Sequence, residues 1–135
     1  MIYNNLIENK RSWTHIKTMV VNNTLPQALL FYGPEGSGKE GHAIELAALL
    51  NSPEDKNNLD KIKIFQHPNI NLIVPLPKDK NITKKSETIN ALSSKTIEQL
   101  INMKKEKMLF PYKKIYFEKS STILINSIRD IKKKS

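Results

Sequence analysis

Hydrophobic positions recur at helical spacing in four parts of the chain. In the first part, apolar side chains stand at positions 13, 16, 19 and 20, Ser12 is the expected N-cap, and an asparagine pair at 22–23 is the expected end. Asn126 is the expected cap of a short helix near the C-terminus. We predict helices at residues 12–20, 40–50 and 96–108, and a short helix through Ile128 and Ile131 within the last element, residues 123–134.

Two shorter apolar runs predict β-strands. The first runs from Ala28 to Tyr32 after Pro26, which favours extended backbone before it. The second covers residues 72–74, after a His67-Pro68 turn. Residues 51–60 are polar and predict a loop, and the basic stretch at about 78–95 predicts an exposed or partly disordered insertion. Strands that alternate with helices indicate an α/β fold.

A glycine-rich loop lies between the first predicted strand and the helix that follows it. Its residues are Gly33, Pro34, Glu35, Gly36, Ser37, Gly38, Lys39 and Glu40. Strand, loop and helix in this order are typical of a phosphate-binding loop, in which glycines let backbone N–H groups surround phosphate oxygens and a lysine reaches the outer phosphates. The next position normally carries a Ser or Thr that binds magnesium, and here it is Glu40. The alternatives are a glycine-rich turn before an ordinary helix and, for Lys39, an exposed lysine at a helix start.

Composition limits the functional class. The chain has 135 residues, a net charge of +9 and no cysteine, and it has no apolar run long enough to cross a membrane. We therefore expect at most one domain, without disulfides, in the cytoplasm. The positive charge would favour a nucleic-acid partner if the lysines gathered on one face, but they are spread along a chain rich in Asn, Ile and Lys.

Three segments together carry a resemblance to a known family. They are residues 25–39, with Leu-Pro-Gln-Ala-Leu-Leu-Phe before the loop, His67-Pro68-Asn69, and Ile125–Ile131. The combination resembles the delta-prime subunits of bacterial DNA polymerase III, which belong to the clamp-loader group of AAA+ ATPases. The resemblance implies a three-layer α/β P-loop AAA+ domain and an accessory, stator-like role. The implied partners are the delta and gamma/tau subunits and, through the complex, the sliding clamp and primed DNA.

The chain departs from the family pattern at three places. No cysteine stands between residues 51 and 66, where the family places a zinc-binding insertion, so we expect no zinc. The glycine of the turn that lines the family's adenine pocket is replaced within Leu6–Asn9. Glu40 replaces the magnesium ligand. These departures predict that ATP is bound weakly or is not hydrolysed, that magnesium is not a regular ligand, and that no catalytic residue is present.

The sequence stops at Ser135, where the family's Walker B strand would begin. The resemblance therefore predicts that residues 1–135 are the N-terminal part of one AAA+ domain, without the lid and collar domains. Both predicted strands would then lack neighbours in the sheet, so we expect the isolated piece to fold poorly.

Two other functions stay open from the sequence. An active P-loop nucleotide kinase or helper ATPase would require a magnesium ligand. A basic nucleic-acid-binding fragment would bind by charge alone, with an affinity that falls steeply as salt rises. Among single residues, Trp13 is expected in the core, His67 in a turn, and Arg129 either at a subunit contact or exposed on its helix.

Overall fold

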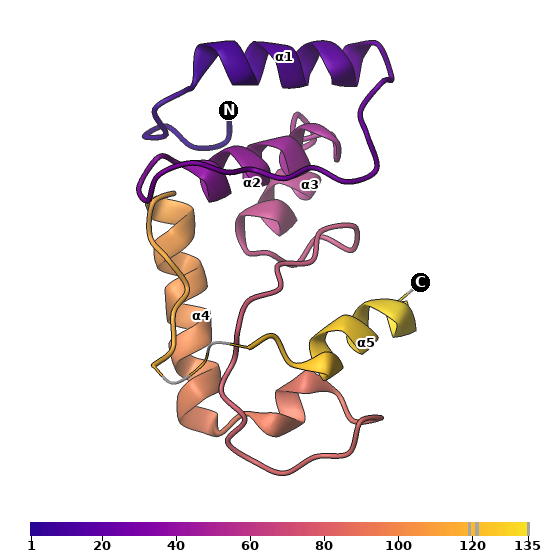
Figure 1. Ribbon diagram of the computed structural model, residues 1–135, viewed down its shortest axis with the longest axis vertical. Helices are drawn as coiled ribbons and strands as arrows, with labels where there is room; N and C mark the ends of the chain where they lie inside the picture. The colour runs from indigo at the N-terminus through magenta and orange to yellow at the C-terminus, as the bar shows by residue number, and fades with distance from the viewer. Residues whose placement is uncertain (119, 121, 135) are drawn as a thin grey trace.

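The computed structural model describes residues 1–118, 120 and 122–134. Its helices are joined by long irregular segments (Figure 1). The elements are α1 (Lys10–Val21), α2 (Lys39–Leu49), α3 (Lys56–Lys63), the 3₁₀ turn η1 (Thr88–Ala91), α4 (Ser94–Leu109) and α5 (Ile125–Lys134). No helix in this described part of the chain is long and apolar enough to span a membrane.

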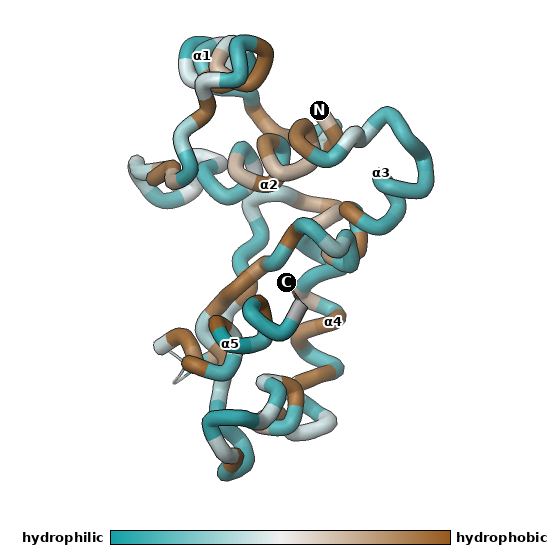
Figure 2. Tube along the Cα trace, turned by 90° about the vertical axis from the view of Figure 1, so that its right-hand side faces the viewer, coloured by the Kyte–Doolittle hydropathy of each residue, from teal (hydrophilic) through white to brown (hydrophobic). Residues whose placement is uncertain are grey.

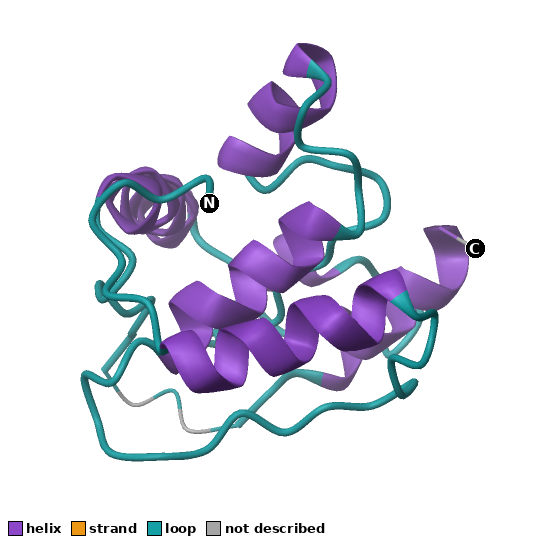
Figure 3. Cartoon of the chain, turned by 90° about the horizontal axis from the view of Figure 1, so that it is seen from above, coloured by secondary structure: helices purple, strands orange, loops and turns teal. Residues whose placement is uncertain are grey.

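The predicted α/β three-layer domain is wrong. Residues 28–32 and 72–74 are loop, and the described residues contain helices and turns but no strand (Figure 3). Leu30 and Tyr32 are 85% and 87% exposed, so the first apolar run lies on the surface. A strand is held by hydrogen bonds to a neighbouring strand, and an apolar run predicts extended backbone without supplying that neighbour. With no partner for either run, no sheet forms among the described residues.

Side-chain caps mark the starts of α1, α3 and α4. Asn9, and not Ser12, caps α1, because the Asn9 side-chain oxygen accepts a hydrogen bond from the Ser12 backbone N–H at 3.2 Å. Asp55 accepts from the N–H groups of Asn57 and Asn58, and so begins α3 inside the stretch predicted as loop. Ser93 caps α4, close to the predicted start. Because of these caps, α1 begins earlier than predicted, and α3 forms in a stretch that was predicted as loop.

The polar stretch at 78–95 is mostly exposed, in line with the first alternative of the prediction, and it contains the short turn η1. Within it, η1 buries Thr88 and Ala91, and α5 packs against η1. Asn126 does not cap α5, because it lies inside the helix and donates to the backbone carbonyls of Thr83 and Ser86 at 3.1 and 2.8 Å. Long-range bonds to the backbone therefore connect this stretch to α5.

Arg129 and Asp79 make further hydrogen bonds that involve the stretch at 78–95. Arg129 of α5 donates a hydrogen bond to the backbone carbonyl of Lys84 at 2.9 Å. Asp79 accepts from the Ser93 N–H and the Thr96 hydroxyl at 2.9 and 2.6 Å, and these bonds lower the pKa of its carboxyl. The stretch is thus attached to the starts of both α4 and α5.

Two small apolar clusters lie on opposite sides of α2. Trp13 and Ile16 of α1 pack against Leu46, which confirms Trp13 as a core residue. Tyr3 and Leu6 of the N-terminal segment pack against Ile44, with Met108 of α4 at the edge. Figure 2 shows that hydrophobic positions also continue along the irregular segments, outside these clusters. Both clusters are therefore built on α2.

A buried carboxylate holds the N-terminal segment on α2. Glu45 is 2% exposed, and its two oxygens accept from the backbone N–H groups of Ile2 and Tyr3 at 2.9 and 2.7 Å. The Tyr3 hydroxyl donates to Met108 Sδ at 3.6 Å. Burial, together with the negative charges of Glu45 and Glu40, raises the pKa of Tyr3.

We predict that Glu45→Gln destabilises the protein by about 1–3 kcal/mol, because the amide turns one of two acceptors into a donor that faces a backbone N–H. Urea unfolding followed by circular dichroism measures the change. Glu98→Gln on the exposed side of α4 is the matched control and should leave the free energy of unfolding unchanged. Equal effects of both substitutions would contradict the anchoring role of Glu45.

Candidate phosphate-binding loop

Left-handed backbone brings the loop into α2. Gly36 and Gly38 have φ of 76° and 81°, and Gly38 is the N-cap of α2. Only glycine adopts such angles without strain. A Cβ on Gly38 would also lie 3.1 Å from Leu6 and 3.3 Å from Tyr112. The glycines of the predicted loop therefore shape a turn that ends at a helix N-terminus, where backbone N–H groups favour anions.

Lys39 folds back across the loop. Its ammonium donates to the carbonyl oxygens of Gly33 and Pro34, both at 2.7 Å. These carbonyls lie at the start of the loop and Lys39 at its end, so the side chain closes the turn. The ammonium must release the two carbonyls before it can contact a phosphate.

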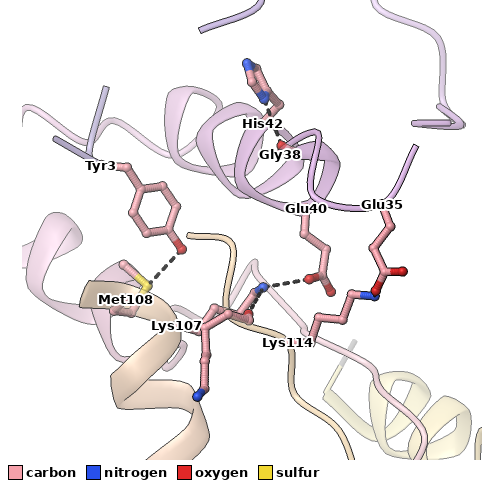
Figure 4. A network of polar contacts seen from close by, with 9 residues as sticks. Tyr3, Glu35, Gly38, Glu40, His42, Lys107, Met108 and Lys114 are labelled. Atoms are coloured by element: carbon pink, nitrogen blue, oxygen red, sulfur yellow. Dashed lines mark hydrogen bonds and ion pairs between the residues drawn. The ribbon is translucent and has the colours of Figure 1, made fainter. Parts of the chain in front are cut away.

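Glu40 lies against a buried lysine of another helix. The Lys107 side chain is 0% exposed, and its ammonium bonds to Glu40 Oε2 at 2.6 Å and to the Lys113 carbonyl at 2.8 Å (Figure 4). The Glu40 side chain is 51% exposed, so its other oxygen is open to solvent. Loss of one partner of a buried ion pair typically costs about 3–5 kcal/mol, and exposure of Glu40 reduces this amount.

A second ion pair crosses the loop at the surface. The Lys114 ammonium bonds to Glu35, as Figure 4 shows, and the two side chains are 60% and 80% exposed. This hydrogen bond and the charge of Lys114 lower the pKa of Glu35. Lys113 makes a longer contact with Glu106, at 3.4 Å between Nζ and Oε2. Exposed pairs of this kind contribute little to stability and are screened by salt.

His42 connects the loop to the segment before α1. Its Nδ1 lies 2.8 Å from the Gly38 carbonyl, and its Nε2 accepts from the Asn9 N–H at 3.1 Å. Because Nε2 accepts, the proton of the neutral ring is on Nδ1 and is donated to Gly38. The buried ring also makes an edge contact with Trp13, with ring centroids 6.1 Å apart. His42 thus holds the last glycine of the loop in place.

The loop lines one wall of a cavity of about 340 Å³. The opposite wall comes from the segment after α4. The lining residues are Gly33, Glu35, Gly36, Gly38, Lys39, Glu40, Pro111, Tyr112 and Lys114. Of the predicted loop residues, Pro34 and Ser37 lie outside this lining. Backbone N–H groups at a helix start, with two lysines at the rim, form an arrangement that can bind a phosphate group.

The second wall, formed by Pro111, Tyr112 and Lys114, was not predicted from the sequence. In the structure, the Tyr112 hydroxyl accepts from the Ile7 N–H at 2.9 Å. Pro111 lies close to α2. A Cβ atom added to Gly41 of α2 would lie 3.2 Å from the Cβ atom of Pro111. No spacing signal in the sequence marks these contacts, because they join segments distant in the chain.

The other residues singled out from the sequence lie elsewhere. His67 is buried in a turn in which its Nδ1 accepts from the Asn69 N–H at 3.2 Å, as predicted. Residues 51–66, where zinc was not expected, hold α3. Within the described residues, no group of three or more His, Asp or Glu side chains is placed to bind a metal ion.

A comparison with protein families shows to which family the chain belongs. A family model described as DNA polymerase III, delta subunit, matches residues 8–135. The chain belongs to the DNA polymerase III delta subunit family. The match confirms the delta-prime-like clamp-loader resemblance of the sequence and relates this family member to the polymerase III clamp loader. No curated protein and no solved structure gives a significant match to the chain.

We predict that Lys114→Gln raises the pKa of Glu35 toward its ordinary value of 4.5, because the neutral amide removes the charge that favours the carboxylate. Carboxyl chemical shifts followed by NMR during a pH titration measure this pKa. Because the folded-state pKa is lowered, the small stabilisation by this pair is present above pH 4.5 and is lost as the pH falls through the folded-state value.

Lys113→Gln is the matched control for that titration, because Lys113 pairs with Glu106 and not with Glu35. The pKa of Glu35 should stay low in this variant. An equal rise in both variants would show that the general positive charge, and not the Lys114 contact, lowers the pKa.

Proposed function

We propose that this protein is an accessory, stator-like subunit of the DNA polymerase III clamp loader and does not hydrolyse ATP itself. Family membership supports a place in the clamp loader. The observation that favours a non-hydrolysing role is the ion pair between Glu40 and Lys107 at the position of the magnesium ligand. The proposed partners are the delta and gamma/tau subunits in the cytoplasm and, through them, the sliding clamp and primed DNA.

The residues present do not fit the magnesium ion of a working P-loop. Position 40 offers no hydroxyl, and one oxygen of its carboxylate is already bound by an ammonium group at 2.6 Å. The other carboxylate that lines the cavity, Glu35, is paired with Lys114. Hydrolysis of ATP requires a cation that bridges the outer phosphates and a group that orients water. This arrangement supports a structural subunit over an active nucleotide kinase or helper ATPase.

The loop itself fits a phosphate group. Gly38, Lys39 and Glu40 at the start of α2 line the cavity, where the unpaired N–H groups of a helix N-terminus favour anions, and Lys39 and Lys114 are the cationic side chains in the lining. We propose that residues 33–39 bind a nucleotide through its phosphates, weakly and without turnover. Weak binding follows because Lys39 must first break two hydrogen bonds to the loop carbonyls.

Reconstitution tests the accessory role. Mixed with purified delta and gamma/tau subunits and the sliding clamp, the protein should enter the assembled complex in size-exclusion chromatography and increase clamp loading on primed DNA. Lys39→Ala should change the ATPase rate of the complex by less than about twofold, because a stator turns over no nucleotide. The control is alanine at the loop lysine of the gamma subunit. Failure to assemble, or equal losses of rate in both variants, would contradict the proposal.

Nucleotide binding is tested separately with a fluorescent ADP analogue. Lys39→Ala should weaken binding about tenfold or more, since a charge-assisted hydrogen bond to phosphate contributes about 1.5–3 kcal/mol. Lys17→Ala on the exposed face of α1 makes the same charge change away from the loop and should leave the affinity unchanged. Equal weakening by both substitutions would show attraction by net charge alone.

A further inference from the structure

The ion pair between Glu40 and Lys107 affects which ligand the loop can bind. The Lys107 side chain reaches α2 from the last turn of α4 and is completely buried. Its ammonium has two bonds, to Glu40 Oε2 and to the Lys113 carbonyl. A buried ammonium keeps its charge only with such partners, so Glu40 is committed to it as the counter-ion.

We propose that Lys107 neutralises Glu40 at the position where a working P-loop recruits its divalent cation, so that the site binds the phosphates of a nucleotide without magnesium. In a working P-loop, the residue after the lysine recruits a cation to the phosphates. Here a fixed ammonium neutralises the carboxylate that stands at that position, and it repels a second cation close to the same carboxylate. The phosphate charge is met by Lys39 and Lys114 and by the backbone N–H groups of α2.

The lysines near the loop have two different roles, one toward a ligand and one toward Glu40. Lys39 and Lys114 line the cavity and can reach a ligand, whereas Lys107 does not line it and contacts only the protein. Lys107 is therefore a positioning residue that acts through Glu40. Without it, an unpaired carboxylate would line the cavity and would both repel phosphate and attract a metal ion.

This inference rests on the proposed binding of nucleotide at residues 33–39. The first experiment measures the affinity of the wild-type protein for fluorescent ADP by anisotropy, once with magnesium and once with EDTA. The two dissociation constants should agree within about twofold, since no metal contributes to binding. Binding that is about tenfold tighter with magnesium would overturn the inference and leave the nucleotide site intact. Binding in neither condition would overturn both proposals.

The second experiment changes the charge at the junction. Lys107→Met keeps an apolar stem of similar length in the buried position and frees Glu40. In EDTA its affinity for ADP should fall about tenfold, through repulsion between the carboxylate and the phosphates, and magnesium should restore it. Glu40→Gln combined with Lys107→Met removes the freed charge and should return binding in EDTA to the wild-type value, with no effect of magnesium.

Lys105→Met is the matched control, because Lys105 lies on the exposed side of the same helix. It should leave the affinity unchanged in both conditions. Circular dichroism melts check that each variant folds, and if Lys107→Met does not, the wild-type comparison decides alone. A Lys107→Met protein that folds and still binds ADP equally with magnesium and with EDTA, at the wild-type affinity, would overturn the inference.

Discussion

The ammonium group of Lys107 is the contact on which the arrangement of the loop depends. It is buried where the end of α4, the start of α2 and the segment after α4 meet, and it bonds to the last two of these (Figure 4). A buried charge must keep its partners, so these segments cannot separate without exposing it or leaving it unpaired. The cavity beside the loop has its second wall because this junction holds residues 111–114 close to α2.

Polar side chains of α2 also hold the N-terminal part of the chain. Near the C-terminal half of the helix, Glu45 binds two N–H groups of the N-terminal segment, and nearer its start His42 joins Gly38 to Asn9. Polar side chains of one helix thus attach the segments on both sides of it, while the apolar clusters are small. These hydrogen bonds join α2 to the N-terminal segment and to the residue before α1.

Prediction from the sequence succeeded where the signal was local. The periodicity around Trp13 indicated α1, and that after Lys39 indicated α2, since helices are stabilised by bonds within the segment. It failed where the outcome depended on distant residues. The run that ends at Tyr32 was predicted as a strand of an α/β sheet, yet no neighbouring strand is present in the described residues and Tyr32 is exposed. The stretch at 78–95 was predicted to be exposed or partly disordered, and nothing in the sequence indicated the hydrogen bonds that Asn126 of α5 donates to the carbonyls of Thr83 and Ser86.

The sequence by itself determined the family, the glycine loop and the replacement of a hydroxyl residue by Glu40. These are properties of residue identity and short spacing, which carry through to the backbone angles of the loop. Only the tertiary structure decided what Glu40 does. Its partner stands 67 residues further along the chain, on a helix whose pattern marks Lys107 as one more lysine of a polar face. Burial and the closeness of two charges are properties of packing, and no local pattern contains them.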